Sequence, residues 1–170
     1  MSFLPDESDY DIRFSDLADE AKLMEWLTDE ETRRWYPPSS ENDAKMWARN
    51  WMGFSRFKAS LTAIYKNQPV GVGTLFLMPY IKVSHMCMLY VCVSPAYRRR
   101  RVGYSLIKNC KHLAKTRFYL ETMHVEVFEG CPVISLLTNH LEFTPLFEQQ
   151  GYVQFTPGEF RSRLILETRL

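Results

Sequence analysis

Residues 91–107 read VCVSPAYRRRRVGYSLI, and this stretch decides how the rest of the chain is organised. The apolar run at its start predicts a strand that ends at Pro95, because proline has no N–H to donate to a ladder. After Gly103, apolar residues recur at helical spacing: Leu106, Ile107, Cys110, Leu113 and Ala114. The pattern therefore predicts a strand, a tight basic turn and a helix.

The basic turn holds four consecutive arginines, residues 98–101, and is followed by Gly103. A helix N-terminus presents unpaired N–H groups and the positive end of the helix dipole, so it attracts anions. Glycine lets the backbone approach an anion where a Cβ would obstruct it. We expect a diphosphate here rather than a carboxylate, because basic side chains supplement the amides. The alternative is a solvated, nucleic-acid-binding or targeting patch, which the position between strand and helix disfavours.

The order Val93-x-Pro95-x-Tyr97-Arg98-Arg99-x-x-Val102-Gly103 resembles motif A of the GCN5-related N-acetyltransferases, the GNAT family. That motif has Arg or Gln, two residues, Gly, one residue, then Gly or Ala, so Arg101 stands at the first glycine. If the loop keeps the family shape, Arg101 holds a backbone angle that glycine adopts freely. The resemblance covers nearly the whole chain. It implies one α/β domain, residues 1–170, with a mostly antiparallel sheet, a splayed parallel strand pair and flanking helices.

Composition is consistent with a single globular domain. The chain has 170 residues, of which 46% are hydrophobic and 24% charged. The net charge of +1 argues against broad nucleic-acid or membrane binding. The four cysteines show no metal-binding spacing, so we expect buried thiols in a reducing compartment and no metal site. We see no apolar leader or membrane span, and we expect the cytoplasm.

Hydrophobic periodicity predicts the remaining elements. They are a strand over 10–14, a helix capped by Ser15 or Asp16, a helix opening at Ser40, strands over 61–65, 70–78 and 85–93, a helix over 103–116, a strand over 119–128, and a late strand pair over 152–155 and 163–168. The strand over 119–128 crosses back parallel to the strand over 85–93. Ligands bind beyond the carboxyl ends of parallel strands, so these two strand ends mark the expected site.

By resemblance, acetyl-CoA lies between the two splayed strands beside a bulge. Backbone groups of Val91 and Val93 bond its pantetheine arm, the amides of residues 99–104 hold its diphosphate, and Val93 N–H is the oxyanion donor. The expected cofactor-binding residues are Val91, Val93, Arg98, Arg99, Arg100, Arg101, Val102, Gly103, Tyr104 and Ser105.

Acetyl transfer to an amine needs a base that takes the amine's proton. His124 and Glu126 share one face of the strand over 119–128, and burying such groups is costly unless they are paired or face a wet cleft. We take Glu126, with His124 nearby, as the candidate base; a structural pair is the alternative. Many family members protonate the departing thiolate with a Tyr of the C-terminal helix. Two rival alignments put Leu137 or Phe147 at that position, and neither has a hydroxyl.

Trp35 and Tyr36 lie on a proline-bounded loop, so we expect them to contact the acceptor, whereas Trp47 and Trp51 pack in the core. The expected function is transfer of an acetyl group to a primary amine of a small molecule or peptide. The alternative is a catalytically weak or inactive acyl-CoA sensor, favoured by the missing Tyr and by Arg101. We expect no nucleic-acid or membrane partner, and a homodimer is left open.

Overall fold

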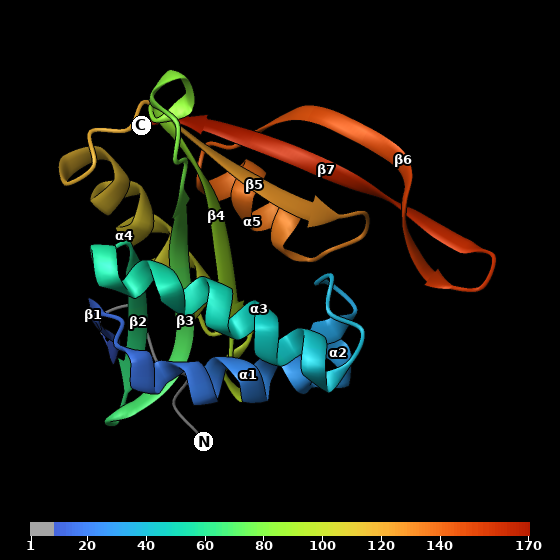
Figure 1. Cartoon of the computed structure of the whole chain (residues 1–170), viewed down its shortest axis with the longest axis horizontal. Coiled ribbons are helices and arrows are strands. Elements are labelled where there is room, and N and C mark those ends of the chain that lie inside the picture. The colour runs from blue at the N-terminus through green and yellow to red at the C-terminus, as the bar shows by residue number, and fades with distance from the viewer. Residues whose placement is uncertain (1–8) are drawn as a thin grey trace.

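The computed structural model describes residues 9–170, which are built around a seven-stranded mixed sheet (Figure 1). Along the chain the elements are β1 (Asp11–Phe14), α1 (Glu20–Thr28), α2 (Glu30–Arg33), α3 (Glu41–Gly53), β2 (Ser60–Tyr65), β3 (Gln68–Leu77), β4 (Met86–Val93), α4 (Val102–Thr116), β5 (Thr122–Phe128), α5 (Val133–His140), β6 (Thr144–Thr156) and β7 (Glu159–Arg169). The strand order is β1-β2-β3-β4-β5-β7-β6. Within the described residues β4 and β5 pair in parallel and every other neighbouring pair is antiparallel, which confirms the predicted fold class.

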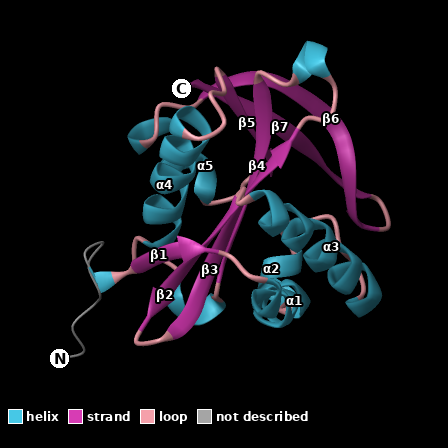
Figure 2. Ribbon diagram, turned by 60° about the vertical axis from the view of Figure 1, so that its left-hand side comes forward, coloured by secondary structure: helices cyan, strands magenta, loops and turns pink. Residues whose placement is uncertain are grey.

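Helices cover both faces of the strands β1 to β4 (Figure 2), with α1 and α3 on one face and α4 on the other. Side chains alternate along β4, so Leu89 packs in the cluster under α4, whereas Cys92 packs in a second cluster under α1 and α3. Trp51 is fully buried in that second cluster and Trp47 packs against it. The predicted core role of both tryptophans is confirmed.

Two glycines of β3 let α4 lie close to the sheet. A Cβ on Gly71 would come within 2.8 Å of Leu106 Cδ1, and a Cβ on Gly73 within 2.9 Å of Cys110 Sγ. Real Cβ atoms do not approach so closely, so a larger residue at either position would force the side chains of α4 to shift. This contact fixes the N-terminus of α4 beside the end of β4.

Local capping signals in the N-terminal half are confirmed. Asp16 and Asp19 form a reciprocal capping box at the start of the short helical turn before α1, and Ser40 does the same with Asp43 at α3. Asp19 also accepts two hydrogen bonds from the guanidinium of Arg13, each at 2.8 Å. Burial by itself raises the pKa of Asp19, but the hydrogen bonds from Arg13, Thr62 and the Asp16 N–H lower that pKa below its ordinary value.

One expectation about the strands was wrong, and the structure decides between the two alignments that the sequence left open. Residues 71–77 of β3 and 87–93 of β4 pair in unbroken register, so the expected bulge is absent from this ladder. The stretch 146–152 lies in β6 rather than in a helix, whereas 133–140 forms α5. The alignment that places Leu137 in the C-terminal helix is therefore the one that the structure supports. Strands β6 and β7 form a long hairpin that projects from the rest of the molecule (Figure 1).

The four cysteines are unpaired, as expected. Burial raises the pKa of Cys87 and of Cys92 to about 12, and it also raises the pKa of Cys110 and Cys131. Nowhere in residues 9–170 is a helix both long enough and apolar enough to span a bilayer.

Candidate functional site

The parallel strands β4 and β5 separate shortly after they begin. They pair at three positions, from Met86 opposite Thr122 to Met88 opposite His124, and then diverge. A cavity of about 820 Å³ occupies the space beyond, lined on one side by residues 89–93 and on the other by residues 125–127. The predicted splay of the parallel pair is therefore confirmed, and the cavity opens at the carboxyl ends of the two strands.

The divergence leaves backbone groups of β4 directed at the cavity. Ser94 N–H donates to Val70 O at 2.9 Å, and in an antiparallel ladder bonded and non-bonded positions alternate. Val91 and Val93 therefore direct their N–H and C=O groups away from β3, toward the side where β5 has departed. His85 lies an even number of residues before Val91 and Val93, so its carbonyl points the same way. That carbonyl accepts a hydrogen bond from the Glu121 N–H, just before β5, at 2.8 Å. The Val91 carbonyl already accepts a hydrogen bond from the hydroxyl of Tyr36.

The arginine loop joins β4 to α4 in a conformation that most residues avoid. Arg99 and Arg101 have φ angles of 60° and 66°, in the left-handed region, each at a cost of about 1 kcal/mol. The angle at Arg101 is the one expected from its place at the motif's first glycine. From the opposite side, the Tyr10 hydroxyl donates to Arg100 O at 2.7 Å and supports the loop.

The N-terminus of α4 faces the cavity with its first amides unpaired inside the helix. No side chain caps this end, and Ser105 is the first residue whose N–H bonds back, to Arg101 O at 3.0 Å. A Cβ on Gly103 would lie 3.7 Å from Val93 Cγ2 and 3.9 Å from Leu136 Cδ2, which are ordinary contact distances. Protein packing would accept an alanine at Gly103, so the glycine leaves space for something else.

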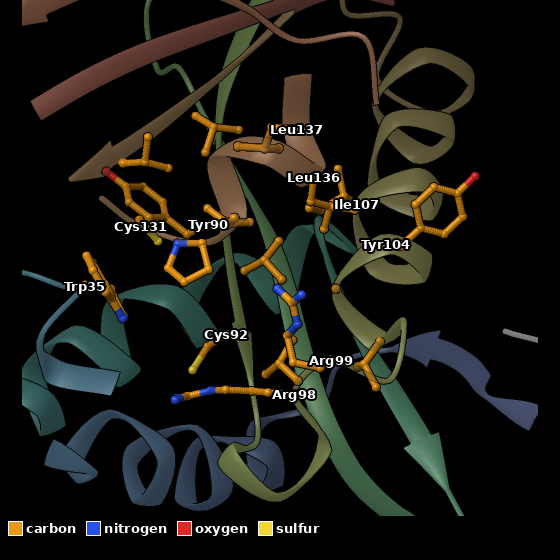
Figure 3. A pocket seen from close by; sticks show the side chains of 18 of the residues that line it. Trp35, Tyr90, Cys92, Arg98, Arg99, Tyr104, Ile107, Cys131, Leu136 and Leu137 are labelled. Atoms are coloured by element: carbon orange, nitrogen blue, oxygen red, sulfur yellow. The ribbon is translucent and has the colours of Figure 1, made fainter. Parts of the chain in front are cut away.

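The neighbouring arginines of the loop have different surroundings (Figure 3). Arg99 points into the cavity, whereas Arg98 turns sideways to α2, where it lies 3.4 Å from Glu31 Oε2 and 3.8 Å from Asp29 Oδ2. Arg101 lines the cavity with its guanidinium 5.3 Å from the Tyr104 ring centre.

Three of the expected site residues are not among the described residues that line the cavity: Arg100, Ser105 and His124. The guanidinium of Arg100 lies 5.4 Å from the centre of the Tyr97 ring. Ser105 is buried in the packing of α4. The remaining cofactor-binding candidates do line it: Val91, Val93, Arg98, Arg99, Arg101, Val102, Gly103 and Tyr104.

The two candidate bases have different environments. Glu126 lines the cavity, and its Oε2 accepts a hydrogen bond from Arg163 Nη1 at 2.9 Å. His124 is buried, and its Nε2 lies 2.8 Å from Oε2 of the partly exposed Glu167 on the neighbouring strand β7. The structural-pair alternative therefore describes His124, while Glu126 is both paired and directed at the cavity.

Trp35 and Tyr36 both line the cavity, but in different ways. Trp35 lies at its edge, with the guanidinium of Arg161 5.9 Å from its ring centre. Tyr36 uses its hydroxyl to hold the Val91 carbonyl, and burial raises the pKa of Tyr36 well above its ordinary value. Both expected residues therefore lie at the cavity, and the hydroxyl of Tyr36 is already used to support β4.

Sequence reasoning missed Tyr90, an aromatic residue of β4 that lines the cavity (Figure 3). Its ring packs against Trp47 and Trp51 at centroid distances of 5.5 and 5.7 Å. Burial raises the pKa of Tyr90 to about 12, and the negative charge of Glu126 acts in the same direction. The available signal was a single phenol in the otherwise apolar strand expected over residues 85–93.

The two positions proposed for the family's missing Tyr are far from equivalent. Leu137 lies on α5, is fully buried and lines the cavity. Phe147 is half-exposed on β6 and is not among the described lining residues. No group of three or more His, Cys, Asp or Glu within residues 9–170 is placed to hold a metal ion.

Comparison with known proteins agrees with this geometry. A family model described as the acetyltransferase (GNAT) family matches residues 21–132, more than half of the chain. The chain therefore belongs to the GNAT family. None of the curated protein sequences matches it significantly.

Solved structures share the fold. One is yncA, a putative acetyltransferase from Salmonella typhimurium with its cofactor acetyl-CoA, at 17% identity and a TM-score of 0.78, covering 95% of this chain and 94% of that one. Another is a ribosomal-protein-alanine N-acetyltransferase from Brucella melitensis, at 18% identity and a TM-score of 0.72, covering 94% of this chain and 99% of that one. At such identities the likeness concerns the fold.

Proposed function

We propose that this protein is an acetyl-CoA-dependent N-acetyltransferase that acts on a primary amine of a small molecule or peptide. The observation that carries the proposal is the cavity between β4 and β5, into which Val91 and Val93 direct backbone groups and onto which the unpaired amides of α4 open. Membership of the GNAT family and the likeness to yncA, solved with acetyl-CoA, support it.

The residues of the cavity fit acetyl-CoA in three respects. The amides of residues 102–104, with Arg99 and Arg101 beside them, suit a diphosphate. The N–H groups of Val91 and Val93 suit the amides of an extended pantetheine arm. The space beside Gly103 would be filled by a Cβ, and the volume of about 820 Å³ is that of a ligand pocket. When bound, acetyl-CoA supplies an acetyl group activated as a thioester.

The chain's own groups then have distinct tasks. Glu126 accepts the proton of the amine, directly or through a water molecule, while Arg163 holds the carboxylate in place. Val93 N–H is the candidate donor to the developing oxyanion. The Tyr90 hydroxyl, whose pKa is about 12, keeps its proton at neutral pH and is the candidate proton donor in place of the hydroxyl that Leu137 lacks.

A second candidate is an acyl-CoA-binding module without catalysis. It is favoured by Leu137 at the position of the family's Tyr and by the strained angle at Arg101. Both candidates predict binding of acetyl-CoA, and turnover separates them. For the compartment we propose the cytoplasm, supported by four unpaired thiols.

The experiment is calorimetric titration with acetyl-CoA and CoA, followed by thiol release in the presence of tyramine, spermidine, kanamycin and an alanine-starting peptide. Micromolar binding with amine-dependent thiol release is expected. Binding without release from any amine would favour the non-catalytic module. No binding at millimolar acetyl-CoA would overturn both.

A further inference from the structure

Arg98 occupies the first position of the arginine loop, yet its side chain contacts a different part of the molecule. It donates to Thr32 Oγ1, and its guanidinium nitrogens lie 3.4 Å from Glu31 Oε2 and 3.8 Å from Asp29 Oδ2. All three partners belong to α2 or to its N-cap. In Figure 3 the side chain runs away from the cavity interior into which Arg99 points.

Helix α2 depends on such contacts because it has only four residues. A helix of this length is not stable by itself. Asp29 caps it, accepting from Thr32 N–H and from Thr32 Oγ1 at 2.9 Å each, and Thr32 is 1% exposed. The guanidinium of Arg98 faces the carboxylates of both Asp29 and Glu31, so it attaches the arginine loop to the cap residue of α2 and to the first turn of that helix.

The segment after α2 forms the acceptor side of the cavity. It carries Trp35 at the cavity edge and Tyr36, whose hydroxyl bonds the Val91 carbonyl. The acceptor side is therefore attached to the cofactor side at two points, Arg98 on the loop and Val91 on β4.

We propose that Arg98 is a positioning residue for the acceptor side of the cavity. Its guanidinium holds α2 and the following residues Trp35 and Tyr36 over the cavity, whereas Arg99 and the α4 amides bind the phosphates. The expected effects of Arg98 on amine kinetics rest on the proposed function. The structural link between Arg98 and α2 rests only on the contacts of its guanidinium with Thr32, Glu31 and Asp29.

The test compares Arg98→Met with Arg99→Met, which remove the same charge from adjacent positions. Amide hydrogen exchange of residues 30–36 measures the hold on α2, and calorimetry measures acetyl-CoA binding. For Arg98→Met we expect exchange in that segment to rise about tenfold and acetyl-CoA affinity to stay within about threefold. For Arg99→Met we expect affinity to fall about tenfold with exchange unchanged.

Kinetics with the amine that gives the fastest thiol release supply a second measure. Arg98→Met is expected to raise the KM for the amine more than it lowers kcat. Arg98→Lys keeps a positive charge that can contact one carboxylate, so its KM should lie between those of the wild type and Arg98→Met. Circular dichroism confirms that each variant folds.

The proposal is overturned if Arg98→Met weakens acetyl-CoA binding as much as Arg99→Met does, or if exchange of residues 30–36 does not change. If the wild-type chain does not bind acetyl-CoA, the proposed function is overturned instead of the proposal about Arg98. The exchange measurement would still decide whether Arg98 holds α2.

Discussion

Arg163 Nη1 donates to Glu126 Oε2 at 2.9 Å, a contact that joins β7 to β5 at the wall of the cavity. Arg163 is further held by Gln149, which accepts from Nη2 at 2.9 Å, and by the Tyr152 ring, whose centre lies 4.0 Å from its guanidinium. The carboxylate of the candidate base Glu126 is therefore oriented by side chains of the projecting β6–β7 hairpin.

Replacing Glu126 by Gln should lower kcat/KM about 100-fold or more, because general base catalysis contributes about that much. Acetyl-CoA affinity should stay within about threefold, since the arginine loop proposed to bind the diphosphate is untouched. Steady-state kinetics and calorimetry measure the two effects. Glu148→Gln, an exposed carboxylate on β6, is the matched control. Equal kcat/KM for Glu126→Gln and the wild type would exclude Glu126 as the base.

Replacing Tyr90 by Phe should lower kcat and leave acetyl-CoA binding unchanged, because only the proposed proton donor is removed. Since the pKa of Tyr90 is raised to about 12, its hydroxyl stays protonated as the solution becomes alkaline. The ratio of wild-type to variant kcat should then be constant between about pH 7 and about pH 10. Tyr80→Phe, at an exposed residue, is the control. A ratio that falls toward one below about pH 10 would show that the Tyr90 hydroxyl loses its proton in that range, against the raised pKa.

Replacing Gly103 by Ala should raise stability and weaken acetyl-CoA binding at the same time. Alanine favours a helix over glycine by about 1 kcal/mol, and the new Cβ meets only ordinary contacts in the protein. The same Cβ occupies space left for the ligand. Gly53→Ala near the end of α3, where nothing lies within 4 Å of the added atom, should leave binding unchanged. Gly103→Trp should abolish binding without unfolding the domain. Unaltered binding by Gly103→Trp would place the diphosphate elsewhere.

Asp19 should contribute to the loss of stability in acid. Because its pKa is lowered in the folded state, its contribution is present above the ordinary pKa of about 3.9 and is lost as the pH falls through the folded value. Asp19→Asn should cost about 2 kcal/mol at neutral pH, since it removes the carboxylate that accepts both hydrogen bonds from the Arg13 guanidinium, and should flatten the loss of stability below about pH 4. Urea unfolding at a series of pH values measures both the loss at neutral pH and the acid dependence. Asp11→Asn, at an exposed residue of β1, is the control. A steeper acid loss in Asp19→Asn would contradict the assignment.

Much of the fold follows from local patterns. The strand, basic turn and helix of residues 91–107 were predicted correctly, because proline, glycine and apolar periodicity act within a few residues. The two capping boxes at Asp16 and Ser40 were equally readable, since each needs only a side chain and an amide three residues away.

Strand pairing decided what local patterns left open. Residues 146–152 joined β6 because β7, the next strand along the chain, folds back as a hairpin partner, and pairing of this kind overrides local propensity. Tyr90 lines the cavity that opens where β5 diverges from β4 beyond Met88, and this divergence depends on two strands that are separated in sequence by α4.

The sequence by itself determined the GNAT fold, the basic loop between β4 and α4, and the left-handed angle at Arg101, since these depend on residue types in fixed local order. Only the tertiary structure decided what the individual side chains do. Arg98 and Arg99 are chemically identical neighbours, yet the acidic end of α2 lies beside Arg98 and the open cavity beside Arg99. The direction in which each arginine side chain points is set by the charges and the open space around it. Folding brings those surroundings together from distant parts of the chain.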